Sequence, residues 1–255
     1  MNNQMNSIIM QPCVSYWGMY KSRRVLNAIL SYYFPVYGLT HKDFFTFYPV
    51  LGFVEALIYQ ADEAVELSQS EKLFDRQEKP WIQRFSKIIS LLKECNLYQL
   101  SIEKELEKLG EYYELENYLM SQNLVTYSDI IKSVELRTSD TRTLHIILLE
   151  IAKKPYHKNV FDLMWPLEVL ADIFDDINSY KDDVDKDHYN TYRMFVRLYG
   201  KKAPDYLQTE IDRYKSIFRE RITKLPEDEQ KVYRQIASVY KQECLIETIP
   251  EPILE

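Results

Sequence analysis

The chain is poor in glycine and cysteine, and each shortage excludes a class of protein. Only five glycines occur among 255 residues, and none belongs to a Gly-x-Gly motif or a glycine-rich phosphate loop. This argues against a P-loop or dinucleotide-binding fold, because those folds use such glycines to bring backbone amides to a phosphate. The three cysteines, Cys13, Cys95 and Cys244, are too far apart for a metal knuckle or a disulfide framework. We therefore expect a cytoplasmic protein.

Positive charge and long apolar runs are also scarce. The chain has 39 acidic and 32 basic residues, a net charge of −7, whereas nucleic-acid binding needs a basic face. We expect no nucleic-acid partner, and an anionic substrate would need a bridging cation. The most apolar stretch, residues 44–59, is shorter than the about 20 residues that span a bilayer. Since residues 1–13 also lack the pattern of a signal peptide, we do not expect an integral membrane protein.

Apolar residues recur at intervals of three and four along most of the chain, which predicts an all-α fold. No change of composition marks a second domain, so we expect one domain over residues 1–255, with 1–13 and 248–255 as loose termini. Thr40 is the expected N-cap of a long helix, with Asp43 three residues later. Helices are predicted over residues 14–34, 41–70, 80–95, 101–120, 138–153, 160–183, 203–224 and 227–247.

The segment 165–183, WPLEVLADIFDDINSYKDD, is the most informative part of the sequence. Asp172, Asp175, Ser179 and Asp183 are three or four residues apart, so they share one side of a helix. Several buried carboxylates repel one another unless a cation neutralises them. Carboxylate and hydroxyl oxygens suit Mg²⁺ or Mn²⁺. The pattern therefore predicts a site for a divalent metal ion.

Residues 175–183, DDINSYKDD, resemble the metal-binding motif of bacterial terpene cyclases, which belong to the class I isoprenoid synthases. Positions one, five and nine of that motif bind metal in the family. The resemblance implies that Asp175, Ser179 and Asp183 are metal ligands, with Asp183 at a position where the family has Glu. Asn190 is similar to the Asn that leads the next helix in these enzymes. The implied fold is a single-domain helical bundle around a central apolar cavity.

The resemblance also implies a second acidic motif and an arginine upstream of the first. The segment 62–66, DEAVE, places Asp62 and Glu66 one helical turn apart, where they could bridge two metal ions. The arginine would contact the diphosphate of the substrate, and Arg137 is the candidate, with Arg142 as its rival. Arginine suits this task because its planar, charged fork binds phosphate oxygens in pairs.

The resemblance implies an enzyme that ionises an allylic prenyl diphosphate, with cyclisation or elimination and release of diphosphate. Such an enzyme is a carbon–oxygen lyase. The implied cofactor is Mg²⁺, three ions when diphosphate is bound, with Mn²⁺ as a substitute. A homodimer is compatible with the resemblance. The rings of Tyr48 and Trp165 are candidates for facing carbocations.

Two alternatives stay open. A prenyltransferase, chain-elongating or head-to-head, usually has an Asp-rich second motif in place of Ser179. A helical protein that binds a prenyl chain or a protein without catalysis would carry the acidic residues as a solvated surface. The chain also departs from the cyclases because no Arg-Tyr pair occurs at the expected distance after the motif, and only Tyr233 and Arg234 come near.

Overall fold

The computed structural model describes residues 14–72, 79–121, 124–243 and 248–254, and within these ranges it contains helices and no β-strand. The predicted all-α class is confirmed. The long helices are joined by short connections, including a π-helical turn, Ile29–Tyr33, and a 3₁₀ turn, Gly200–Lys202. The α-helices are α1 Tyr16–Ala28, α2 Phe34–Tyr37, α3 His41–Ser70, α4 Pro80–Glu94, α5 Leu100–Ser121, α6 Tyr127–Arg137, α7 Ser139–Ala152, α8 Lys158–Asp185, α9 Thr191–Tyr199, α10 Ala203–Thr223 and α11 Glu227–Glu243.

The start of α3 agrees with the sequence prediction. The backbone N–H and the hydroxyl of Thr40 both donate to Asp43 Oδ2, at 2.8 Å and 2.7 Å. Gly38 precedes this cap with a φ of 64°, a conformation that glycine adopts without steric cost. The cap and the glycine turn together set where the longest helix begins.

Two helices, α6 and α9, are additional to those predicted from periodicity. The break between α6 and α7 falls at Thr138, where neither glycine nor proline marks it. Helix α9 begins after Asn190, whose side chain accepts a hydrogen bond from the N–H of Arg193 at 3.2 Å. Both short helices flank the acidic segment of α8, so they bear directly on the site.

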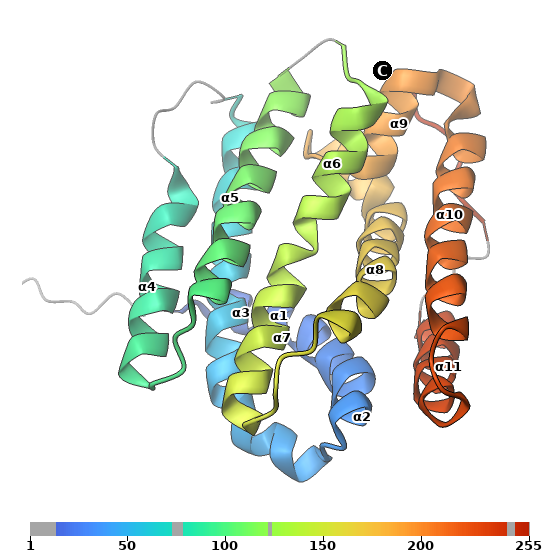
Figure 1. Cartoon of the computed structure of the whole chain (residues 1–255). Helices are drawn as coiled ribbons and strands as arrows, with labels where there is room; N and C mark the ends of the chain where they lie inside the picture. The colour runs from blue at the N-terminus through green and yellow to red at the C-terminus, as the bar shows by residue number, and fades with distance from the viewer. Residues whose placement is uncertain (1–13, 73–78, 122–123, 244–247, 255) are drawn as a thin grey trace, which may run out of the picture.

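Helices α3 and α8 belong to different sides of the bundle (Figure 1). Helix α3 packs against α1, α4, α5 and α7, whereas α8 packs against α6, α9 and α10. By length and composition α3 could cross a membrane, but 56% of its most apolar window is buried inside the bundle. Buried side chains from α1 through α11 form a continuous hydrophobic cluster around these two helices.

The C-terminal segment 248–254 is not loose, contrary to the prediction. The hydroxyl of Tyr192 donates to the carbonyl of Pro250 at 2.6 Å, and the N–H of Ile253 donates to the hydroxyl oxygen of Tyr180 at 2.8 Å. Tyrosines of α8 and α9 thus hold an extended, proline-stiffened tail. Residues 1–13, the other predicted loose end, lie outside the described residues.

Helix α1 approaches α3 unusually closely at Gly18. A Cβ atom at this position would lie 2.9 Å from the carbonyl oxygen of Ala56, closer than real Cβ contacts. The N–H of Gly18 also donates to Ser15 Oγ at 2.9 Å, which caps α1. Glycine therefore allows α1 to lie directly on the helix that carries the upstream acidic motif.

We expect Gly18→Ala to lower the melting temperature, because the added methyl group must push α1 away from α3. Gly52→Ala is the matched control, since the nearest atoms to its new Cβ are at 3.5 Å, an ordinary contact. There the alanine should stabilise the helix by about 0.5–1 kcal/mol. Thermal unfolding followed by circular dichroism measures both, and equal melting temperatures would contradict the close contact.

Candidate functional site

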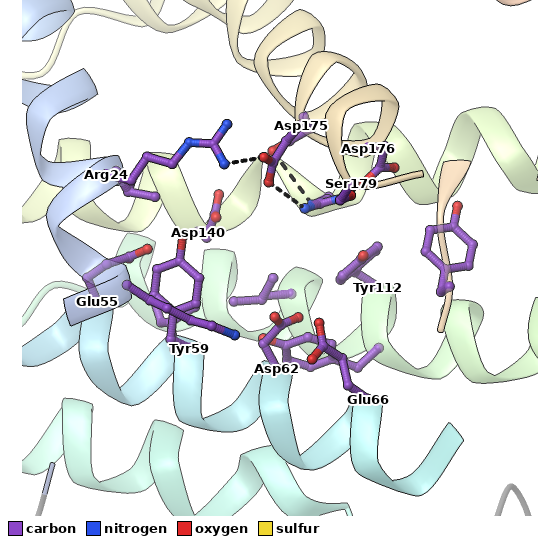
Figure 2. A pocket seen from close by; sticks show the side chains of 18 of the residues that line it. Arg24, Glu55, Tyr59, Asp62, Glu66, Tyr112, Asp140, Asp175, Asp176 and Ser179 are labelled. Atoms are coloured by element: carbon purple, nitrogen blue, oxygen red, sulfur yellow. Dashed lines mark hydrogen bonds and ion pairs between the residues drawn. The ribbon is translucent and has the colours of Figure 1, made fainter. Parts of the chain in front are cut away.

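A cavity of about 440 Å³ opens between α3 and α8 (Figure 2). Residues of α1, α5, α6 and α7 and Tyr189 complete its wall. It collects almost every site residue predicted from the sequence. Those in its wall are Asp62, Glu66, Arg137, Asp175, Ser179 and Asp183, and of the predicted metal and diphosphate ligands Arg142 alone is not in the wall.

The two acidic motifs face each other across this cavity. Helix α3 contributes Glu55, Asp62 and Glu66 at spacings of seven and four, so all three lie on one side of the helix. Figure 2 shows these side chains directed toward Asp175 and Ser179 of α8. Segments far apart in sequence therefore present oxygen atoms to one enclosed space.

The C-terminal ends of α3 and α8 are joined at the edge of the cavity. The hydroxyl of Ser70 lies 2.8 Å from Nε2 of His188, and the N–H of Tyr189 donates to Gln69 Oε1 at 2.8 Å. These bonds connect the last turn of α3 to the segment that follows α8. They keep the two acidic helix faces in register.

Ser179 and Asp183, two of the predicted metal ligands, are in direct contact. Ser179 Oγ donates to Asp183 Oδ2 at 2.5 Å, and Asn190 Nδ2 donates to the same oxygen at 2.9 Å. Asn190 also donates to the carbonyl oxygen of Asp176 at 2.6 Å. Asn190 therefore fixes Asp183 while it caps α9.

Arg137 lies among three aspartates of α8. Its Nη1 donates to Asp176 Oδ1 at 2.5 Å, and other guanidinium nitrogens lie 3.6 Å from both Asp172 and Asp175. Asp176 Oδ2 accepts the N–H of Thr191 at 2.8 Å, which ties the cluster to the start of α9. As the last residue of α6, Arg137 brings a positive charge into the cavity wall.

Arg142 has a different place from Arg137. Its Nε donates to Glu168 Oε2 at 3.1 Å, and the hydroxyl of Tyr33 donates to the other oxygen of Glu168. Glu168 is buried among core residues. Arg142 therefore balances a carboxylate of the core, and of the two candidates the geometry favours Arg137 for contact with a bound anion.

Four further carboxylic side chains of the wall are absent from the predicted site: Glu55, Glu116, Asp140 and Asp176. Glu55 and Glu116 are 1% and 3% exposed, and the Oε2 atom of each is buried without a hydrogen-bond partner. The sequence could have identified Glu55, because it precedes Asp62 by seven residues. This spacing is two helical turns and places both residues on the same side of the helix. Asp140 follows Arg137 by three residues, in the first turn of α7.

The aromatic residues of the wall also differ from those predicted. Trp165 packs edge-on against Tyr214 with ring centroids 5.6 Å apart, and Tyr48 packs against Phe44 at 5.5 Å. Neither ring lines the cavity. Periodicity identifies residues that share a helix face, but it does not say which of them reach the cavity. The rings that do are Tyr20, Tyr59, Tyr112, Tyr113 and Tyr189.

The cavity wall is more acidic than the predicted apolar cavity. Among its described residues, nine are carboxylic and four are basic. The aliphatic part of the wall consists of Val25, Ile58 and Leu109. The carboxylic side chains are Glu55, Asp62, Glu66, Glu116, Asp140, Asp172, Asp175, Asp176 and Asp183, and the basic ones are Lys21, Arg23, Arg24 and Arg137.

Burial and mutual repulsion favour the protonated form of three of these groups, Glu55, Asp62 and Asp172. Burial raises the pKa of Asp62 to about 8, and the nearby charge of Glu66 adds to this shift. Burial also raises the pKa of Glu55 and Asp172 well above the usual range, while Arg137 opposes the shift at Asp172. A bound cation would reverse this preference because it favours the ionised form.

The donor chemistry of the wall fits a hard divalent cation. Carboxylate and hydroxyl oxygens are what Mg²⁺ and Mn²⁺ prefer, and the Oε2 atoms of Glu55 and Glu116 are buried without a hydrogen-bond partner. In the described part of the chain, no three or more His, Cys, Asp or Glu side chains form a preassembled metal-binding group. Asp175 is held by Arg24 and Arg137, so a metal ion would have to displace these contacts.

No family model, curated protein or solved structure matches this chain. The function must therefore be inferred from the cavity and from the resemblance of residues 175–183 to the terpene-cyclase motif.

We expect Glu55→Met to stabilise the ligand-free protein by about 1–3 kcal/mol, because it removes a buried polar atom without a partner. Glu168→Met is the matched control. Glu168 is also buried but has two partners, so its loss leaves Arg142 uncompensated and should cost about 3–5 kcal/mol. Urea unfolding measures both. If Glu55→Met destabilised the protein as Glu168→Met does, Glu55 would have a structural role.

The raised pKa of Asp62 predicts how stability depends on pH. The folded state keeps a proton to about pH 8 that the unfolded chain releases near its usual pKa of 3.8. The contribution of this group to stability is complete below the lower pKa and is lost as the pH rises to the higher one. We expect the metal-free protein to melt at a lower temperature at about pH 8.5 than at about pH 5.

The same measurement includes its control and a metal arm. Asp62→Asn should show a smaller decline with pH, because it cannot ionise. Mg²⁺ should raise the melting temperature more at the higher pH, where it does not compete with protons. A pH profile identical in the wild type and in Asp62→Asn would contradict the shift.

Proposed function

We propose that this chain is a metal-dependent class I isoprenoid synthase, and that it ionises an allylic prenyl diphosphate in the cavity between α3 and α8. The observation that carries the proposal is that Asp62 and Glu66 face Asp175, Ser179 and Asp183 across one cavity, with Arg137 in its wall. The all-α class does not by itself identify the helical-bundle fold of that superfamily. That fold is therefore part of the proposal.

The acidic and basic side chains of the cavity would have different roles. Asp62, Glu66, Asp175, Ser179 and Asp183 would hold Mg²⁺, which supplies positive charge to the diphosphate oxygens. Arg137 would donate paired hydrogen bonds to the same leaving group. The bond between C1 and the diphosphate oxygen breaks, and both electrons leave with the diphosphate.

The rest of the cavity acts on the allylic cation. The faces of Tyr59, Tyr112 and Tyr113 offer negative electrostatic potential to a positive carbon. The cation, with or without cyclisation, then loses a proton to the departed diphosphate and gives an alkene. No protein nucleophile is required, so the chemistry rests mainly on stabilisation of the departing diphosphate.

A prenyltransferase is the second candidate, and one observation favours it. Lys21, Arg23 and Arg24 of α1 line the same cavity as the acidic motifs. They could hold the diphosphate of a second substrate. Ser179 in the wall favours the lyase, because prenyltransferases usually have an Asp-rich motif there. A module that only binds a chain or a protein would not need two acidic faces around one cavity.

We expect release of diphosphate from at least one C10 to C25 prenyl diphosphate with Mg²⁺ or Mn²⁺, and none with chelator. Asp175→Asn should lower kcat at least about tenfold, because it weakens charge stabilisation in the transition state. Product analysis with and without isopentenyl diphosphate separates the two candidates. A longer diphosphate formed only with isopentenyl diphosphate would identify a prenyltransferase, and equal turnover in chelator would reject both.

Two arginine variants test whether Arg137 or Arg142 contacts the diphosphate. Arg137→Gln should lower the melting temperature, because Asp172 and Asp176 lose their positive partner. Assayed below its melting temperature, it should still lose activity at least about tenfold, since the lost contact stabilises charge in the transition state. Arg142→Gln should also lower the melting temperature, because it leaves Glu168 buried without its positive partner. Assayed below its melting temperature, it should keep most of its turnover. The reverse order of activities would move the diphosphate contact to Arg142.

A further inference from the structure

An ion pair connects α1 to α8 across the mouth of the cavity. Arg24 Nη1 contacts Asp175 Oδ1, the first of the predicted metal ligands on α8 (Figure 2). Asp175 also lies 3.6 Å from Nη2 of Arg137. One carboxylate that the proposed function assigns to metal is thus shared by two arginines from different helices.

The two arginines hold Asp175 in different ways. The side chain of Arg137 is 23% exposed and also contacts Asp172 and Asp176, so its position is fixed by the cluster. The side chain of Arg24 is 67% exposed and forms an ion pair with Asp175. An ion pair this exposed costs little to break. Arg24 can therefore leave Asp175 without disturbing the fold.

Helix α1 is held at a place from which Arg24 can reach a ligand in the cavity. Gly18 lets α1 lie against Ala56 of α3. Lys21 Nζ lies 3.6 Å from Glu63 and 5.8 Å from the ring centroid of Tyr59, both on α3. With α1 fixed at these points, the side chain of Arg24 extends over the opening toward α8.

Tyr233 and Arg234, the residues that come nearest to the Arg-Tyr pair of the cyclases, lie elsewhere. Tyr233 lines a separate cavity of about 370 Å³, together with Tyr37 and His157. Arg234 donates to Gln230 of its own helix at 2.7 Å. Neither residue is in the wall of the acidic cavity. Among the described residues of that wall, the basic side chains other than Arg137 all come from α1.

We propose that Arg24 is a second diphosphate-binding residue, which pairs with Asp175 in the ligand-free protein and transfers to the diphosphate when a metal ion takes Asp175. The inference rests on the proposed function and adds a residue and an order of contacts to it. Arg24 keeps Asp175 neutralised until the metal arrives, and its planar fork then meets an anion in the same opening. Through this side chain α1 covers the mouth of the occupied cavity.

The experiment compares Arg24→Gln with Arg234→Gln, since the second variant removes an arginine that lies away from the cavity. Binding of Mn²⁺ alone is measured by electron paramagnetic resonance. Binding of inorganic diphosphate in the presence of Mg²⁺ is measured by calorimetry. Both readouts are independent of turnover.

For Arg24→Gln we expect Mn²⁺ to bind as tightly as in the wild type or up to about fivefold tighter, because a competitor for Asp175 is gone. Affinity for diphosphate should fall at least about tenfold, as expected for the loss of a charge-assisted contact. Arg24→Lys should give an intermediate loss, because it keeps the charge without the fork. Arg234→Gln should match the wild type in both measurements.

The possible failures are distinguishable. If the wild type binds metal and diphosphate, and Arg24→Gln binds diphosphate equally well, the role of Arg24 is overturned while the proposed function stands. Weaker Mn²⁺ binding in Arg24→Gln would overturn the competition for Asp175. If the wild type binds neither probe, the proposed function and the inference both fall.

Discussion

Arg137 is the positive charge around which the rest of the site is arranged. Burying a guanidinium group is costly unless negative partners surround it, and Asp172, Asp175 and Asp176 supply them. Because Arg137 ends α6 and Asp176 also binds the start of α9, this cluster sets how α6, α8 and α9 meet. The buried carboxylic groups of the cavity wall that it does not contact ionise at low cost only when a ligand brings positive charge.

Hydrogen-bond partners distinguish a buried carboxylic group of the core from one of the cavity wall. Glu168 is buried with Arg142 and Tyr33 as partners, so its charge contributes to the packed structure. Glu55 is equally buried, and one of its oxygens has no partner. A protein gains no stability from such a group in the absence of ligand. Its place in the cavity wall indicates that it acts on what the cavity binds.

Local chemistry explains which parts of the structure could be predicted from sequence. Thr40 and Asp43 mark the start of α3, and spacing alone places Asp62 with Glu66 and Asp175 with Ser179. Periodicity locates the break after Arg137, since a helix is predicted from residue 138 and α7 begins at Ser139. It does not reveal that Arg137 ends a separate helix, α6. Whether Arg137 or Arg142 faces the cavity depends on that break and on the position of Glu168. Which arginine faces the cavity is determined by the packing between helices. The local pattern of a single sequence does not reveal that packing.

In the proposed function, the charge balance of the cavity requires the metal ion and the diphosphate to bind together. Nine carboxylic and four basic side chains leave five formal negative charges when all are ionised. A diphosphate alone would be repelled by this excess, since like charges in a weakly screened cavity interact strongly. A metal ion alone must displace arginines or protons from the carboxylates. When both bind, the metal neutralises the wall and the displaced arginine has a new anion to contact, so each ligand lowers the cost of binding the other. Thermodynamic linkage makes this coupling reciprocal.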